Sequence, residues 1–172
     1  MANLMQLNVL SPDAYVFQAD NISYVDAHTE GGAVGILPRH ATMVAALDPA
    51  PLKYRDETGE AHYLFVDGGF LEVKDNVVTI LSVAAETAES IDVDKAKAAL
   101  ERAKAKIDNL DKDIDLPAVQ ADLKRAEARL KTVKLSQAKA RARQTQLQKA
   151  SCSTQGAFFV FSGRRGCPAA RF

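Results

Sequence analysis

The chain has 172 residues, of which 47% are hydrophobic and only 6% aromatic, so it can form one ordinary domain with an aliphatic core, or a small domain with an appendage. Its net charge of zero hides a segregation: residues 1–116 hold 10 basic and 20 acidic side chains, whereas residues 117–150 hold 9 and 2. With no apolar run of about 20 residues and no basic, apolar leader, the sequence argues against a membrane-spanning helix and a secretion signal.

The first 87 residues show the pattern of a β domain. Met5, Leu7 and Val9 alternate with polar residues, as in a half-buried strand. Three further strands are expected at 61–66 (apolar on both faces), 70–74 and 77–83. Turns are expected at 67–69 (Asp-Gly-Gly) and at 75–76 (Asp-Asn). Short strands with this spacing predict an antiparallel β-sandwich or flattened barrel over residues 1–87.

Residues 88–148 have a helical period. The first apolar stripe consists of Ala96, Ala99, Leu100, Ala103, Ile107 and Leu110, and the second of Val119, Leu123, Ala126, Leu130 and Val133. Ser90 or Asp92 can cap the first helix, and Pro117 suits the first turn of the second. We therefore predict a C-terminal antiparallel two-helix hairpin. Because its stripes are rich in alanine, which buries little area, we expect the hairpin to be held weakly and to be able to move.

The last segment, residues 149–172, matches neither pattern. Its apolar residues cluster among Gly, Ser, Arg and Pro, so we expect an irregular tail and assign it no function. Both cysteines, Cys152 and Cys167, lie here, so a disulfide framework for the preceding chain is excluded and a reducing compartment is favoured.

The segment "GGAVGILPRH" (31–40) concentrates glycine next to proline and histidine. A phosphate-binding loop requires a Gly-Lys-Ser/Thr sequence that is missing, so a tight turn presenting a surface is favoured. His40 as the general base of a small hydrolase remains an alternative, although no nucleophile motif accompanies it. The three histidines (His28, His40 and His62) lack metal-ligand spacing, so we expect no metal site.

The second helix is strongly basic. Its face could be merely solvated, could bind nucleic acid, or could dock onto an acidic protein surface. No aromatic side chains are interleaved with the basic residues, which weakens the second possibility. A free-standing nucleic-acid-binding module stays open as the alternative to a regulatory arm.

A basic helix follows three characteristic stretches, which occur in this order along the chain: "GGAVGILPRHATMVAAL", "FVDGGFLEVKDNVVTIL" and "IDVDKAKAALERA". From about residue 4 to about residue 140 the chain resembles the epsilon subunit of the bacterial F-type ATP synthase. The resemblance implies a non-catalytic subunit of the central rotor stalk that couples proton translocation to ATP synthesis. It implies a sandwich bound to the gamma subunit and the membrane c-ring, and a mobile hairpin that inhibits ATP hydrolysis by reaching the catalytic beta and alpha subunits. The implied location is peripheral, at the cytoplasmic face of the bacterial plasma membrane, with only indirect membrane contact and no nucleic acid.

The resemblance also assigns residues to roles. Subunit-interface positions are Glu30, Gly31, Gly32, Gly35, Pro38 and His40. The inhibitory basic helix comprises Lys124, Arg125, Arg129, Lys131, Lys134, Lys139 and Arg141. Regulatory ATP, rather than any required cofactor, would be bound by Ile91, Asp92, Lys95, Ala96, Arg125 and Arg129. Lys95 stands where the family motif has arginine; it keeps the charge but loses the bidentate fork, so weaker binding is expected.

Overall fold

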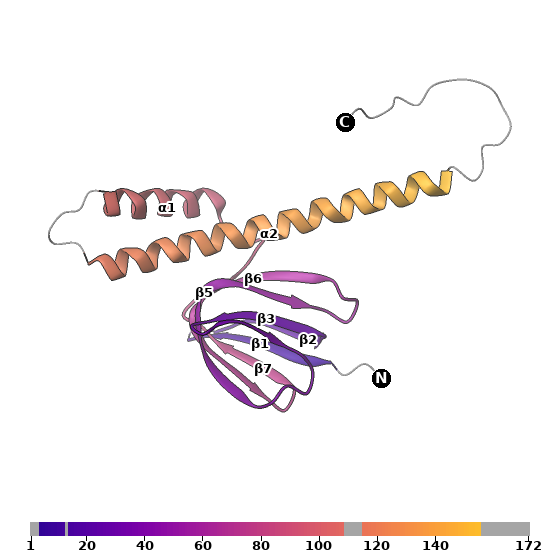
Figure 1. Cartoon of the computed structure of the whole chain (residues 1–172), viewed down its shortest axis with the longest axis horizontal. Coiled ribbons are helices and arrows are strands. Elements are labelled where there is room, and N and C mark those ends of the chain that lie inside the picture. The colour runs from indigo at the N-terminus through magenta and orange to yellow at the C-terminus, as the bar shows by residue number, and fades with distance from the viewer. Residues whose placement is uncertain (1–3, 13, 109–114, 156–172) are drawn as a thin grey trace, which may run out of the picture. The chain divides into compact units, whose positions relative to one another are not determined.

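The computed structural model describes residues 4–12, 14–108 and 115–155, with side chains omitted at 14–15 and 146–155. Eight strands are followed by two helices (Figure 1). The elements are β1 (Met5–Ser11), β2 (Ala14–Ile22), β3 (Tyr24–Thr29), β4 (Gly32–Ile36), β5 (Met43–Arg55), β6 (Ala61–Lys74), β7 (Val77–Leu81), β8 (Ala85–Thr87), α1 (Val93–Asp108) and α2 (Leu116–Gln155). One compact unit, Met1–Gln137, holds the strands, α1 and the first half of α2.

The strands form one open sheet with the order β2-β1-β7-β6-β5-β3-β4, and β8 pairs with β6. Folding of this sheet over itself gives the β-sandwich that the alternating sequence predicts. Neighbouring pairs are antiparallel except β1 with β7, which run parallel. Side-chain alternation reveals which face of a strand is buried but not its direction, so the sequence could not indicate this pair.

The sandwich core is aliphatic, as the scarcity of aromatic residues predicts. Fully buried members on the inner strand faces are Leu7, Val9, Val25, Ile36, Leu71, Val78 and Ile80. Within the segment 61–66, residues 64–66 are buried on both faces because Leu64 and Val66 belong to this core, whereas Phe65 belongs to a second cluster with helix residues. The both-sided burial predicted for 61–66 is therefore confirmed for residues 64–66, whereas residues 61–63 are half-buried.

The turn expected at Asp67-Gly68-Gly69 is wrong, because β6 continues through these residues from Ala61 to Lys74. Gly68 and Gly69 have φ of 62° and 109°, a left-handed region that bends the strand without reversing it. A Cβ on Gly69 would collide with the carbonyl of Leu81 on β7. The two glycines thus let one long strand serve both layers of the sandwich.

The turn expected at Asp75-Asn76 is confirmed, with φ of 49° and 68°, the left-handed values of a tight hairpin. Asn76 also ties distant segments together. Its Oδ1 accepts a hydrogen bond from the Arg39 amide (2.6 Å), and its Nδ2 donates to the Leu4 carbonyl (3.0 Å). The turn therefore anchors the segment 37–40 to the start of the chain.

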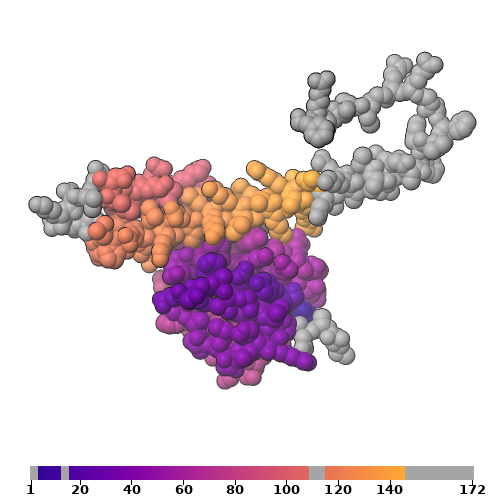
Figure 2. Space-filling view, viewed as in Figure 1, coloured from indigo at the N-terminus to yellow at the C-terminus, as the bar shows by residue number. Residues whose placement is uncertain are grey.

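Both predicted helices are present, and α1 lies alongside the first half of α2 in antiparallel orientation (Figure 1). The space-filling view shows the two helices next to each other (Figure 2). Asp92 is the N-cap of α1, because its Oδ1 accepts bonds from the amides of Asp94 and Lys95, each 3.1 Å. Pro117 lies in the first turn of α2, as predicted. Stripe members Ala96, Ala103, Val119, Ala126 and Val133 are buried.

The second helix is longer than expected. Residues 149–155, predicted to begin the irregular tail, continue α2 to Gln155, since Gly156 is the first glycine or proline after Pro117. The rest of the predicted tail, 156–172, lies outside the described residues. In the part of the chain that the structure describes, no helix combines the length and apolar character needed to cross a membrane.

Candidate functional site

Two arginines of α2 join the hairpin to the sandwich. Arg125 Nε donates to Asp67 Oδ1 on β6 (2.8 Å), and Arg129 Nε donates to Glu86 Oε1 on β8 (3.0 Å). The guanidinium of Arg129 also lies over the ring of Phe65, 4.4 Å from its centroid. Arg125 and Arg129 are four residues apart on α2, and their contacts on β6, Asp67 and Phe65, are two residues apart. Both separations are about 6–7 Å along one face, so the spacing of the arginines matches that of their contacts on the strand.

Burial makes the Arg125–Asp67 pair asymmetric. The Asp67 side chain is only 11% exposed, whereas that of Arg125 is 42% exposed and also reaches Asp122 on its own helix (3.2 Å). The Asp67 carboxylate raises the pKa of Arg125 above its ordinary value by hydrogen bonding and charge attraction. Asp67 therefore depends on this arginine for its compensation whenever the hairpin covers it.

The apolar contact between hairpin and sandwich is narrow. Its buried members are Phe65, Ile91, Ala128 and Val133, with Val93 packed at their edge. Only Phe65 is large, and one alanine is among the buried members. We call this set the apolar seam. Its small size, together with the exchangeable ion pairs, is what a separable contact requires, because few apolar groups return to water on opening.

A groove of about 430 Å³ lies where α1, α2 and β8 meet. Its lining is Glu86, Ser90, Ile91, Asp92, Lys95, Ala96, Ala99, Arg102, Ala126 and Arg129. A second hollow shares Ala99, Arg102, Ala126 and Arg129 with it and adds Arg125 and Lys106. The two hollows together are lined by five cationic side chains and by three carboxylates, those of Glu86, Asp92 and Asp122, with several alanines between them. The excess of positive charge suits an anionic ligand.

The structure brings the predicted nucleotide residues together. Ile91, Asp92, Lys95, Ala96 and Arg129 all line the groove, and Arg125 lines the adjoining hollow. Sequence reasoning missed Glu86 and Arg102. Arg102 follows Lys95 by seven residues, two helical turns on the same face, so periodicity was a usable signal for it. Nothing local to Glu86 indicated that β8 would face the helices.

Asp92 has two roles at the groove. Besides capping α1, it pairs through Oδ2 with Lys95 Nζ (3.3 Å). The pKa of Asp92 is held below its ordinary value, despite some desolvation, mainly by the hydrogen bond from the Lys95 amide. Hydrogen bonds from the Lys95 side chain and the Asp94 amide contribute less. The carboxylate is thus fixed in its ionised form beside the ammonium that the resemblance places near a phosphate.

The glycine-rich segment 31–40 is not one turn but an edge strand, β4, between two turns. Gly32 has φ of 119°, and a Cβ on Gly35 would lie 2.8 Å from the hydroxyl of Tyr24. The backbone at Gly32 therefore favours glycine, and a larger residue at position 35 would require the Tyr24 ring to shift. His40 Nδ1 lies 2.9 Å from the carbonyl of Ala41, so that ring nitrogen is engaged locally.

The predicted interface residues remain available on this edge. Glu30, Gly31, Gly32, Gly35 and His40 are exposed, and Pro38 is half-buried. Their contact with another subunit stays a prediction.

The basic residues of α2 divide into two groups. Arg125 and Arg129 turn toward the sandwich, whereas Lys124, Lys131 and Lys134 are exposed. Lys139 and Arg141 lie on the part of α2 in the second unit, where Arg141 is exposed. The inhibitory role of this set stays a prediction.

The sandwich exposes an apolar row. Phe70 on β6 lies opposite Leu81 on β7, and Val44 on β5 shares the same outer face. Val83 follows two residues after Leu81 and is 72% exposed, and Phe70 is 58% exposed. These four exposed residues are here called the apolar row; exposed apolar side chains on one part of a surface are typical of a protein-contact surface.

Comparisons with known proteins cover the strands and the helices separately. A sequence model of the β-sandwich domain of the ATP synthase delta/epsilon chain matches residues 4–88, and one of its long α-helix domain matches residues 89–134. The chain is 38% identical over 131 residues to the ATP synthase epsilon chain of Nitratidesulfovibrio vulgaris, covering 76% of this chain and 96% of that one. It is 40% identical over 126 residues to that of Bacillus velezensis, covering 73% and 94%.

A solved structure is similar as well. A chain in the cryo-EM structure of the Euglena gracilis mitochondrial ATP synthase (OSCP/F1/c-ring, rotational state 1) matches with a TM-score of 0.64 and 29% identity. The match covers 74% of this chain and 79% of that one.

Proposed function

Because this chain belongs to the ATP synthase delta/epsilon family and is an epsilon chain, we propose that it is a non-catalytic subunit of the central rotor stalk that couples proton flow to ATP synthesis. The match of both domains in order carries this proposal. Similarity to a chain resolved in an assembly of F1 and c-ring supports the placement. The peripheral position at the cytoplasmic face of the membrane follows from the same assignment.

The sandwich carries the docking function. The apolar row supplies a dry contact for the gamma subunit, because burying exposed apolar surface is the main favourable term in protein association. The rigid edge around Glu30 and His40 faces the c-ring. Phe70→Asp tests the first part: gamma should no longer co-purify with the chain, while a matched Leu116→Asp change at an exposed apolar position of α2 leaves co-purification intact. Retention of gamma by Phe70→Asp would reject this surface.

The hairpin carries the regulatory function. In the folded state Arg125 and Arg129 are paired with Asp67 and Glu86. On release, the basic face of α2 becomes free to meet acidic segments of the catalytic beta and alpha subunits and to block rotation in the hydrolysis direction. The observation that supports a releasable arm is the narrow apolar seam, reinforced by ion pairs that another acidic surface can replace.

ATP is the proposed regulatory ligand of the folded hairpin. The groove's volume of about 430 Å³ supports this proposal, since pockets for such ligands span about 300–1,000 Å³. Lys95, Arg102 and Arg129 would hold the phosphates, with Asp92 fixing Lys95. The family assignment does not depend on this ligand.

Calorimetric titration with MgATP tests the nucleotide proposal. Arg129→Gln should weaken binding, whereas Lys124→Gln, which removes an exposed charge of the same helix, should not. No heat at millimolar MgATP with the unmodified chain would reject ATP as the ligand.

A further inference from the structure

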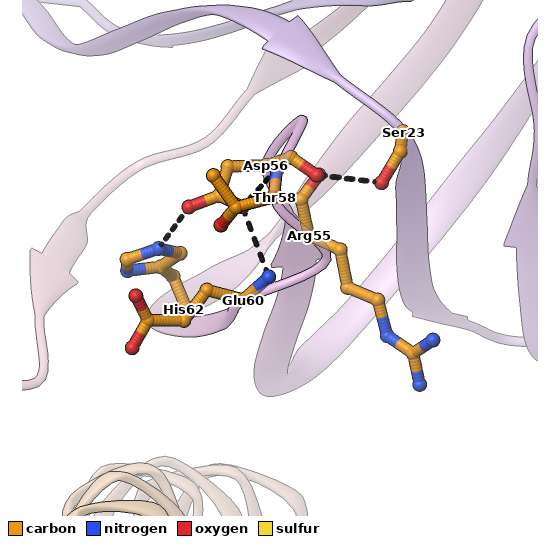
Figure 3. A network of polar contacts seen from close by, with 6 residues as sticks. All are labelled: Ser23, Arg55, Asp56, Thr58, Glu60 and His62. Carbon is orange, nitrogen blue, oxygen red and sulfur yellow. Dashed lines mark hydrogen bonds and ion pairs between the residues drawn. The ribbon is translucent and has the colours of Figure 1, made fainter. Parts of the chain in front are cut away.

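A cluster of potential metal ligands lies at the turn between β5 and β6, and none of its members lines the groove or belongs to the apolar row. Asp56, Glu60 and His62 each place a carboxylate oxygen or imidazole nitrogen within 4.8 Å of the other two (Figure 3). The spacing of the three histidines relative to one another predicts no metal site, because it leaves neighbouring carboxylates out. The spacing Asp-x3-Glu-x-His brings mixed ligands together across a hairpin instead.

The carboxylate of Asp56 is oriented by its own turn. Its Oδ1 accepts three hydrogen bonds, from the Thr58 amide (2.9 Å), the Thr58 hydroxyl (2.6 Å) and the Glu60 amide (2.9 Å). The other oxygen, Oδ2, is thereby directed at His62 Nε2 and accepts a hydrogen bond from it at 3.1 Å, a contact that a bound ion would replace. Two ligands bound at about 2.1 Å to one ion lie about 3.0 Å apart in octahedral and about 3.4 Å apart in tetrahedral coordination, so this separation suits a shared ion.

The surrounding contacts fix the other parts of the cluster. The His62 ring stacks on Tyr54, with centroids 5.0 Å apart and planes at 15°, which sets the direction of its nitrogens. Ser23 Oγ donates to the carbonyl of Asp56 (2.8 Å) and holds the turn against the start of β3 (Figure 3). Outer contacts that orient ligands in this way are a general property of metal sites.

We propose that Asp56, Glu60 and His62 bind a first-row divalent cation such as Mn²⁺ or Zn²⁺. Two carboxylates and one imidazole are ligands that such ions accept, and water completes the coordination. The Asp56 and His62 side chains are 30% and 39% exposed, so an ion can enter from solvent and keep its waters. The bound ion links the two sides of the β5–β6 turn. This site is independent of the stalk function proposed above.

The test uses the full chain and Mn²⁺, monitored by NMR. Mn²⁺ broadens nearby proton signals, and the chain's three histidines provide an internal comparison. We expect the His62 ring signals to broaden at Mn²⁺ concentrations that leave those of His28 and His40 sharp. Equal broadening of all three rings would overturn the proposal.

Two variants separate binding from folding. Glu60→Gln keeps the backbone amide that Asp56 uses and should weaken Mn²⁺ binding on the order of tenfold or more. Glu57→Gln removes an exposed carboxylate of the same turn outside the cluster and should leave binding unchanged. Equal effects of the two substitutions would show that Mn²⁺ responds only to the charge of the turn, which would also overturn the proposal.

Discussion

Substituting Arg129 with alanine should shift the hairpin toward its released state. The change removes the ion pair between Arg129 and Glu86 and the cation–π contact between Arg129 and Phe65. The side chains of Arg129 and Glu86 are 27% and 33% exposed. A partly exposed ion pair contributes about 0.5–1 kcal/mol and a cation–π contact at such a site about the same. The loss of about 1–2 kcal/mol raises the ratio of released to folded hairpin by a factor of about 5–30.

Hydrogen exchange measured by mass spectrometry reads this shift. A released helix with few tertiary contacts is only marginally stable, so amides of 116–135 should exchange faster while β1 and β7 of the sandwich stay protected. Lys124→Ala is the matched control, since it removes one exposed positive charge from the same helix. If Arg129→Ala exchanges no faster than Lys124→Ala, the arginine does not hold the hairpin and the reasoning fails.

Other contacts give further predictions. Gly69→Ala forces a Cβ against the Leu81 carbonyl at φ 109° and should lower the free energy of unfolding by more than about 2 kcal/mol. Gly59→Ala, at φ 82° with open space around it, should lower it by about 1 kcal/mol. Equal shifts of the two variants in thermal melts would contradict the role of Gly69 in the strand bend. Ala128→Leu overfills the apolar seam and should speed exchange in the helices alone; unchanged exchange would show that the seam is not the contact. Because the pKa of Asp92 is lowered in the folded state, its stabilisation of α1 is present above its ordinary value of 3.8 and is lost as the pH falls below it. Helicity followed by circular dichroism should therefore drop on acidification, and Asp92→Asn, which still caps but does not titrate, should flatten this response; an unaltered response would exclude Asp92 as its source.

The sequence predicted the architecture because two periodicities dominate it. Alternation at Met5, Leu7 and Val9 and the helical stripe around Ala96 and Ala126 correspond directly to buried faces. These signals are local, since each depends only on how a strand or helix presents successive side chains. The cap at Asp92 and the turn at 75–76 were predicted for the same reason.

The errors concern choices that local sequence leaves open. Gly68 and Gly69 can reverse a chain or bend a strand, and the outcome depends on Leu81 and Pro49 of neighbouring strands. The local sequence predicts a turn at Asp67, whereas the structure pairs this residue with Arg125, 58 residues away.

Part of the groove likewise could not be predicted from the local sequence. Lys95 and Arg129 could be assigned through a family motif, but Glu86 enters only because β8 pairs with β6. The carboxylate–imidazole cluster at the β5–β6 turn was missed since its members matter only once the hairpin closes.

ATP hydrolysis by the reconstituted synthase tests the regulatory arm most directly. A chain ending after Ser90 keeps the sandwich and its apolar row but lacks both helices, and a chain ending after Gln155 keeps the arm as the control. The account predicts faster hydrolysis with the first chain than with either the control or the full chain. Equal hydrolysis rates with all three chains would contradict it.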